Sequence, residues 1–135
     1  MPVNFNGHIS DQLPAPAAQM QRAQFYGDGL FETIRVFDSR IPFMQFHWER
    51  LAAGAEILGL HFPTAWNPQF FEQEIKKITP PNARIRLTVW RAAGGLYLPD
   101  DDTAQFMLTA SPLTQTCFAW PENGISLGRA VSVQL

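Results

Sequence analysis

The 135-residue sequence has little of several residue types, and each shortage excludes a class of protein. It has one cysteine, Cys117, which has no partner for an internal disulfide. Its ten lysines and arginines form no basic run and the formal net charge is -2, which excludes the charge pattern of a nucleic-acid-binding protein. Charged residues or prolines interrupt every apolar run well before the roughly 20 residues of a membrane span. With no secretion signal at its start, the chain is expected to be cytoplasmic.

What the sequence does contain suits one domain with a sizeable core, since 46% of its residues are hydrophobic and 13% aromatic. Alternating polarity over residues 3–5, followed by Asn6-Gly7, predicts a first short strand pair closed by a tight turn. A loop is expected over Leu13 to Ala18, where two prolines interrupt the chain. Residues 30–37 are rich in Phe, Thr, Ile and Val and predict a strand, which a turn would connect to residues 41–43 as a β-hairpin.

Two helices are predicted in the middle of the sequence. Residues 46–58 place a stripe of side chains at helical spacing, and Gly59 suits the end of that helix. A second helix begins at Asn67-Pro68 and ends before Pro80-Pro81. Three further strands are expected over 84–91, 105–110 and 125–133. This order predicts an α+β fold, a mainly antiparallel sheet with two helices packed on one face.

Two blocks of the sequence resemble a known enzyme family. Residues 25–36 read Phe-Tyr-Gly-Asp-Gly-Leu-Phe-Glu-Thr-Ile-Arg-Val, and residues 47–51 read His-Trp-Glu-Arg-Leu. Together they are similar to the opening signature of the class IV (fold-type IV) pyridoxal-phosphate aminotransferases, in residue type and in spacing. The resemblance implies that residues 1–135 are the small N-terminal domain of such an enzyme, a homodimer that transfers an amino group between an amino acid and a 2-oxo acid.

The resemblance assigns Arg50 to the phosphate of pyridoxal 5'-phosphate. A guanidinium group suits this task because its planar fork donates two hydrogen bonds to one phosphate group. The alternative interpretation of Arg50 is an ordinary solvated arginine on an amphipathic helix. His47 lies one helical turn earlier, and it either supports the site or has a structural role.

Substrate contacts are expected from two strands. Phe31, Thr33 and Arg35 share one strand face, which the family directs toward substrate, and Phe31 would then be a wall of the pocket. Its alternative is a place in the core. Arg84 and Arg86 point to one side of a later strand, and the resemblance implies that Arg86 binds a second substrate carboxylate, such as that of glutamate. Solvent exposure without a ligand is the alternative for Arg86.

The loop over residues 92–99 bears on the choice of substrate. D-amino-acid aminotransferases place an arginine and a histidine here, whereas this sequence has Leu96 and Leu98 near those positions. This difference disfavours a D-amino-acid substrate. The Gly94-Gly95 pair and the nearby Tyr97 resemble the loop of aminodeoxychorismate lyases, which take part in p-aminobenzoate and folate synthesis, although those lyases have an arginine at the Leu96 position.

No residue of this chain is predicted to be catalytic. The family chemistry requires a lysine that holds the cofactor, and the only lysines, Lys76 and Lys77, lie mid-helix and are expected to be surface residues. The resemblance implies that the catalytic lysine belongs to a second domain beyond Leu135. The chain alone is therefore expected to be inactive and to bind pyridoxal phosphate weakly or not at all. No metal site is predicted.

Three functions remain open at this point. The first is an aminotransferase, and the second is 4-amino-4-deoxychorismate lyase, which would use the same cofactor and the same lysine. The third is a non-catalytic interaction module, if the chain is naturally complete. A chain separated from its second domain would expose apolar surface and self-associate.

Overall fold

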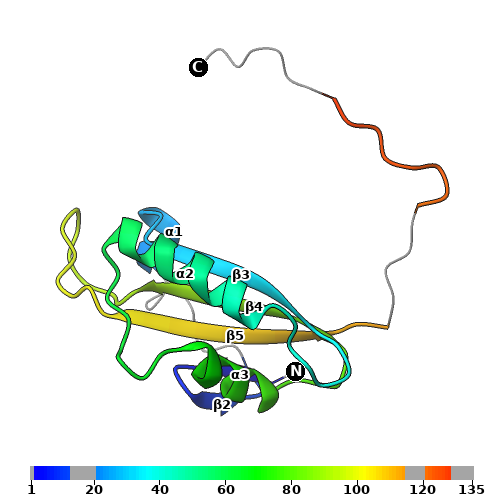
Figure 1. The fold of residues 1–135 in the computed structure, drawn as a ribbon. Coiled ribbons are helices and arrows are strands. Elements are labelled where there is room, and N and C mark those ends of the chain that lie inside the picture. Colours follow the sequence, from blue (N-terminus) through cyan, green and yellow to red (C-terminus); the bar gives the residue numbers. More distant parts are fainter. Residues whose placement is uncertain (1, 13–20, 115–120, 129–135) are drawn as a thin grey trace.

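A five-stranded antiparallel sheet with helices against it forms the fold. The computed structural model describes residues 2–12, 21–114 and 121–128. In the order of the chain shown in Figure 1, the elements are β1 Val3–Phe5, β2 His8–Ser10, α1 Gln21–Phe25, β3 Gly29–Val36, α2 Met44–Leu58, α3 Pro68–Lys76, β4 Ala83–Arg91 and β5 Ala104–Pro112. Neighbouring strands follow the order β2-β1-β5-β4-β3, and each pair is antiparallel. The predicted α+β class is confirmed.

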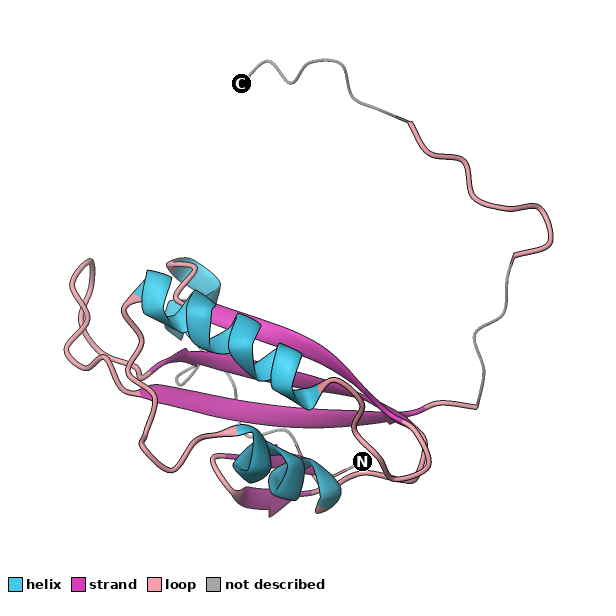
Figure 2. Cartoon of the chain, viewed as in Figure 1, coloured by secondary structure: helices cyan, strands magenta, loops and turns pink. Residues whose placement is uncertain are grey.

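The two faces of the sheet differ in chemistry because side chains alternate along each strand. In β4, Ile85 and Leu87 are buried, whereas Arg84 and Arg86 are exposed on the other face. Helices α2 and α3 cover the buried face, as Figure 2 shows, and they build one core with the strands. The predicted placement of two helices on one face is therefore confirmed. The opposite face, which carries Arg84 and Arg86, is called the open face below.

The boundaries of both predicted helices follow the local signals in the sequence. Helix α2 ends at Leu58, and Gly59 caps it with a φ of 64°, in the left-handed region that favours glycine. Helix α3 begins after Asn67, whose side chain accepts a hydrogen bond of 2.8 Å from the backbone N–H of Phe70. Pro68 occupies the first turn of α3, where a missing N–H costs no helical hydrogen bond.

The first strand pair is also confirmed, and the turn between β1 and β2 has positive φ at Asn6 and Gly7. Strand β1 pairs on its other edge with β5, which lies between β1 and β4. The first and last strands of the described sheet are thus neighbours, although about a hundred residues separate them in sequence. The loop expected over residues 13–18 lies outside the described residues.

Two predicted strand features are wrong or only partly described. Residues 37 and 40 make a single bridge, but residues 41–43 form no strand, and β3 pairs with β4 instead. Pro42 cannot donate a backbone hydrogen bond, and Phe43 adopts a φ of 63° that leads directly into α2. The strand expected over 125–133 is absent from residues 125–128, and its remainder lies outside the described residues.

Helix α1 was not predicted, and it covers one end of the open face. It is only five residues long. A Cβ atom added to Gly29 would lie 3.0 Å from the Cβ of Ala23, so the glycine permits the close approach of α1 to β3. On the open face next to Gly29, Trp90 is fully buried, and the ring of Phe5 lies 5.8 Å away between centroids.

Candidate functional site

A buried carboxylate joins the edge strand β3 to helix α2. Glu32 is 3% exposed, and its Oε1 accepts a hydrogen bond of 2.6 Å from Nε of Arg50, while its Oε2 accepts one of 2.5 Å from Nη2. Nδ1 of His47 lies 2.7 Å from the same Oε2. Arg50 and His47 project from one side of α2, three residues apart, so both reach the carboxylate. Glu32, Arg50 and His47 are called the edge cluster below.

The electrostatics of the edge cluster favour the charged form of Glu32. Burial by itself would raise the pKa of Glu32, because a buried charge loses its hydration. Hydrogen bonds and positive charge from Arg50 and His47 outweigh burial, and they hold the pKa of Glu32 below its usual value. In return, Glu32 raises the pKa of Arg50. The glutamate is therefore a carboxylate at neutral pH.

The edge cluster leaves part of Arg50 accessible. Its side chain is 71% exposed, although one side of the guanidinium is bound to Glu32. The hydrogen bonds found among the described residues use Nε and Nη2 and leave Nη1 without a protein partner. A guanidinium group has five N–H donors, so Arg50 keeps donors for an anion. The predicted phosphate ligand thus has the exposure and the donors that a phosphate requires. Arg50 is an exposed arginine, as its alternative interpretation holds, but a buried partner fixes it in place.

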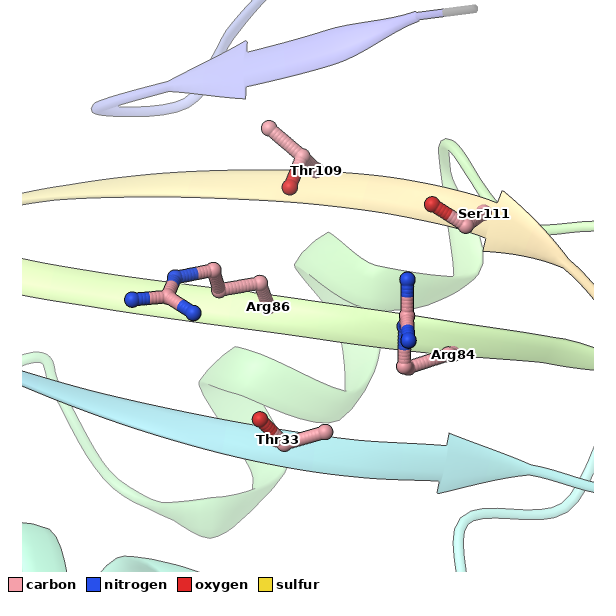
Figure 3. A pocket seen from close by; sticks show the side chains of 5 residues that line it. All are labelled: Thr33, Arg84, Arg86, Thr109 and Ser111. Atoms are coloured by element: carbon pink, nitrogen blue, oxygen red, sulfur yellow. The ribbon is translucent and has the colours of Figure 1, made fainter.

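A second set of polar side chains lines a hollow on the open face. Figure 3 shows that it is lined from three adjacent strands by two arginines and three hydroxyl residues: Arg84, Arg86, Thr33, Thr109 and Ser111. The strand register explains this gathering, since Thr33 and Thr109 both oppose Arg86, and Ser111 opposes Arg84. The hollow has a volume of about 250 Å³. None of its lining residues is acidic, so it suits an anionic group.

Phe31 contacts Arg86, one of the residues that line this hollow. Its ring is 56% exposed, which makes its alternative interpretation as a core residue wrong. The guanidinium carbon of Arg86 lies over this ring, 3.9 Å from its centroid. The expected sharing of one face by Phe31, Thr33 and Arg35 is confirmed by the register of β3 against β4. The structure therefore brings Phe31 and Arg86, the two predicted substrate residues, into contact.

The loop over residues 92–99 is tied to α1. Arg22 is 4% exposed, and its Nη1 donates hydrogen bonds of 3.1 Å and 2.9 Å to the carbonyl oxygens of Gly94 and Leu96. Asp28 holds the same guanidinium at 2.7 Å. The side chains of Leu96, Tyr97 and Leu98 are largely exposed. Arg22 thus holds the backbone of this loop, while the apolar side chains of the loop remain exposed to solvent.

The predicted residues fall on two sides of the sheet. Arg50 lies on the side of the helices, next to Glu32, whereas Phe31 and Arg86 lie on the open face. Successive residues Phe31, Glu32 and Thr33 of β3 alternate between these two sides. Since β3 is an edge strand of the described sheet, a ligand or a second domain that touches both groups has to approach at this edge. The sequence signal that could have found Glu32 is its place inside the 25–36 block.

Three further features of the described residues bear on function: the lysines, the possible metal ligands and the length of the helices. Lys76 and Lys77 are 60% and 47% exposed and pair with Glu72 and Glu74, which confirms their expected surface positions. Across residues 2–12, 21–114 and 121–128, no three histidine, cysteine, aspartate or glutamate side chains gather as a metal site would need. Within the same ranges, no helix has the length and apolar character required to cross a membrane.

Comparison with known proteins relates this geometry to a family. The model of the family described as amino-transferase class IV matches residues 29–134. A putative branched-chain-amino-acid aminotransferase of Methanocaldococcus jannaschii is 30% identical over 101 residues, which are 73% of this chain and 35% of that protein. The match begins at Gly29, so the family model includes Phe31, Glu32, Arg50 and Arg86.

Solved structures agree in fold. The branched-chain aminotransferase of Thermoproteus uzoniensis superposes with a TM-score of 0.67 at 20% identity, over 85% of this chain and 41% of that one. The 4-amino-4-deoxychorismate lyase of Pseudomonas aeruginosa gives 0.62 at 24% identity, over 82% and 39%. The chain thus spans about two fifths of the length of these relatives. With the family model matched over most of its length, the chain belongs to the class IV aminotransferase family, whose members depend on pyridoxal phosphate.

Proposed function

We propose that residues 1–135 are the N-terminal domain of a pyridoxal-phosphate enzyme that transfers an amino group between an amino acid and a 2-oxo acid. The observation that carries the proposal is the exposed guanidinium of Arg50, held at the sheet edge by the buried Glu32. When bound, the cofactor supplies the electron sink for chemistry at the α-carbon of the substrate. The role of Arg50 is to bind the cofactor phosphate through its remaining donors.

The open face supplies the substrate contacts in this proposal. Arg86 binds a substrate carboxylate, and the ring of Phe31 forms a wall of the pocket and orients the guanidinium. Because Arg50 and Arg86 lie on opposite sides of β3, the active site forms around that edge. The second domain, which brings the catalytic lysine, would close the site from there. Homodimer formation belongs to the same proposal, and so does the inactivity of residues 1–135 alone.

A second candidate is 4-amino-4-deoxychorismate lyase. The hollow contains two arginines, Arg84 and Arg86, and three hydroxyl groups, which suits a substrate with two carboxylates. Aminodeoxychorismate and glutamate both fit that description, whereas the side chains of leucine, isoleucine and valine carry no charge. The hollow therefore favours a diacid over a branched-chain amino acid as the ligand at this position. The structural likeness to the lyase of Pseudomonas aeruginosa is consistent with this candidate.

The test has two steps. The coding sequence is first read beyond Leu135, and we expect a domain that carries a lysine in a position to hold the cofactor. A stop codon directly after Leu135 would contradict the enzyme proposal and favour a non-catalytic module. The full-length protein is then incubated with cofactor and either glutamate plus a branched 2-oxo acid, or aminodeoxychorismate. Release of p-aminobenzoate without any amino transfer would contradict the aminotransferase proposal and support the lyase proposal.

The isolated residues 1–135 provide a further check on the division of roles. We expect no transamination from this chain and weak or no binding of pyridoxal phosphate, because its phosphate contact is not joined by a covalent anchor. Binding is measured by equilibrium dialysis with the labelled cofactor. Affinity comparable to that of the full-length protein would contradict the proposed division between two domains.

A further inference from the structure

The burial of Glu32 requires a reason. A carboxylate that is 3% exposed has lost most of its hydration, and such a charge is tolerated only when nearby donors compensate it. Both of its oxygens accept hydrogen bonds from Arg50, and His47 contacts one of them. An uncharged residue would fill the same space on β3 at a lower desolvation cost. The presence of a carboxylate at this position is therefore better explained by its contacts with Arg50 and His47 on α2 than by packing in the core.

The contact between Glu32 and Arg50 has a defined direction. Nε and Nη2 lie on one edge of the guanidinium, and both bind Glu32 at 2.5 to 2.6 Å. Two bonds from one rigid fork to one carboxylate fix the plane of the guanidinium as well as its position. The edge that carries Nη1 then points away from Glu32. A free arginine side chain has many rotamers, and the ligand that binds it has to restrict them; Glu32 has already done so.

A second buried carboxylate of the same protein shows the contrast. Glu74 on α3 is 6% exposed, and it binds Nδ2 of Asn4 at 2.6 Å and Nζ of Lys77. These contacts tie α3 to β1 and orient no arginine. Lys77 is a point charge on a flexible stem, so its contact with Glu74 fixes no plane. Glu74 is thus the internal comparison for a buried carboxylate with a structural role.

We propose that Glu32 is a positioning residue, which aims the free edge of the Arg50 guanidinium at the phosphate of the cofactor. The proposal rests on the function proposed above, since it needs Arg50 to be the phosphate ligand. Glu32 itself does not touch the cofactor. It places the donors of Arg50 at the sheet edge before the cofactor arrives, and it stays bound to the opposite edge of the same guanidinium.

The test compares two ligands that differ only in the phosphate. Pyridoxal 5'-phosphate and pyridoxal are titrated into the cofactor-free full-length protein, and the ratio of the two dissociation constants measures the phosphate preference. The variants are Glu32→Gln, Arg50→Gln and the double variant, with Glu74→Gln as the matched control. Glutamine retains the size of glutamate and removes its charge, so both glutamate variants lose a buried carboxylate.

We expect Glu32→Gln to lower the phosphate preference about tenfold, on the scale seen for residues that orient a direct ligand. It should leave pyridoxal binding unchanged. Arg50→Gln should lower the preference at least as much, and the double variant should resemble Arg50→Gln alone, because Glu32 acts through Arg50. Glu74→Gln should leave the ratio as in the unaltered protein.

The outcomes separate the two proposals. If Arg50→Gln leaves the phosphate preference unchanged, the role of Arg50 in the proposed function fails, and the role of Glu32 with it. If Arg50→Gln lowers the preference but Glu32→Gln does not, or weakens both ligands equally, only the positioning role is overturned. Should Glu32→Gln fail to fold, Glu32→Asp is used, since it keeps the charge but withdraws it by one methylene. An unchanged ratio in that variant would equally overturn the proposal.

Discussion

The guanidinium carbon of Arg86 lies 3.9 Å from the centroid of the Phe31 ring, so that a strand β4 arginine rests on an aromatic face from β3. Thr33 is the residue that directly opposes Arg86, and Phe31 is therefore its diagonal neighbour on the same face. The contact leaves the donors of Arg86 available at the hollow while it limits the directions in which they point. An exposed phenylalanine thus has a defined task on an otherwise polar surface.

The first prediction concerns Phe31. Phe31→Ala should raise the KM of the full-length enzyme for its amino-group donor about fivefold with little change in kcat, because a contact of about 1 kcal/mol that orients Arg86 is lost. Steady-state kinetics measure both constants. The matched control is Phe37→Ala, which removes a ring from a similar pair with Arg35, 5.8 Å away. An equal rise of KM in both variants would show that Phe31 has no special role.

The second prediction concerns the pH dependence of stability. The pKa of Glu32 is lower in the folded protein than its usual value of 4.5, so its ionised form stabilises the fold above that pH. This contribution is lost as the pH falls through the folded pKa. Glu32→Gln should lower the free energy of unfolding at pH 7 by on the order of 1 to 3 kcal/mol. The difference between the two proteins should begin to shrink below pH 4.5 and disappear once the pH lies below the folded pKa of Glu32.

Urea denaturation of both proteins between pH 7 and pH 3 measures this difference. The opposite trend, a difference that grows as the solution becomes more acidic, would mean that the folded protein does not favour the carboxylate. Glu74→Gln, titrated in parallel, reports the behaviour of a buried glutamate with other partners.

The third prediction concerns the loop over residues 92–99. Arg22→Lys should increase amide hydrogen exchange in this loop, since a lysine cannot reproduce the separate bonds to Asp28 and to the carbonyl oxygens of Gly94 and Leu96. Exchange in β4 and β5 should change little. Mass spectrometry of peptic fragments measures both. Arg40→Lys, a change at an exposed position, is the control. Unchanged exchange in the loop would show that Arg22 does not anchor it.

The fourth prediction concerns self-association of residues 1–135. Phe43, which precedes α2, and Phe46 and Ile57 on α2 are 71%, 66% and 86% exposed. Helical spacing puts Phe46 and Ile57 on the same side of α2 as Arg50. Such a surface is normally covered. Light scattering should detect oligomers that grow with concentration, and Phe46→Glu should reduce them. Gln45→Glu adds the same charge to a neighbouring exposed position and should have less effect. A monomer at high concentration would contradict the prediction.

How much of the structure can be predicted from the sequence depends on how far apart the interacting residues are along the chain. Gly59 and Asn67 mark helix ends through contacts within a few residues, and both predictions are confirmed. The hairpin expected at residues 30–43 is wrong because Phe43 turns into α2 directly after the Phe37–Arg40 bridge, and the strand partner of β3 is β4, which comes much later in the sequence. The final strand expected over 125–133 rested on strand-like residues bounded by turn residues, and residues 125–128 do not bear it out.

The candidate site shows the same limit. The sequence blocks identify Arg50, Phe31 and Arg86 as candidates, and the strand register confirms that the last two share a face. The sequence does not single out Glu32, because its partners lie 15 and 18 residues away and alternation along β3 indicates only that its side chain points inward. The hollow depends on β5, which follows β4 in sequence but contributes Thr109 and Ser111 through a register that no local pattern specifies.

The contacts of Arg91 have a mechanical consequence. Its guanidinium donates to the carbonyl oxygens of Leu58 and Gly59 at the end of α2, and it also binds Asp102. Arg91 is the last residue of β4, the strand that carries Arg86. Its hydrogen bonds therefore link this end of β4 to the end of α2, the helix that carries Arg50. These contacts therefore fix how Arg50 and Arg86, the two arginines proposed to bind anionic groups, are placed relative to each other. If the site opens or closes around a ligand, we expect Arg50 and Arg86 to move together.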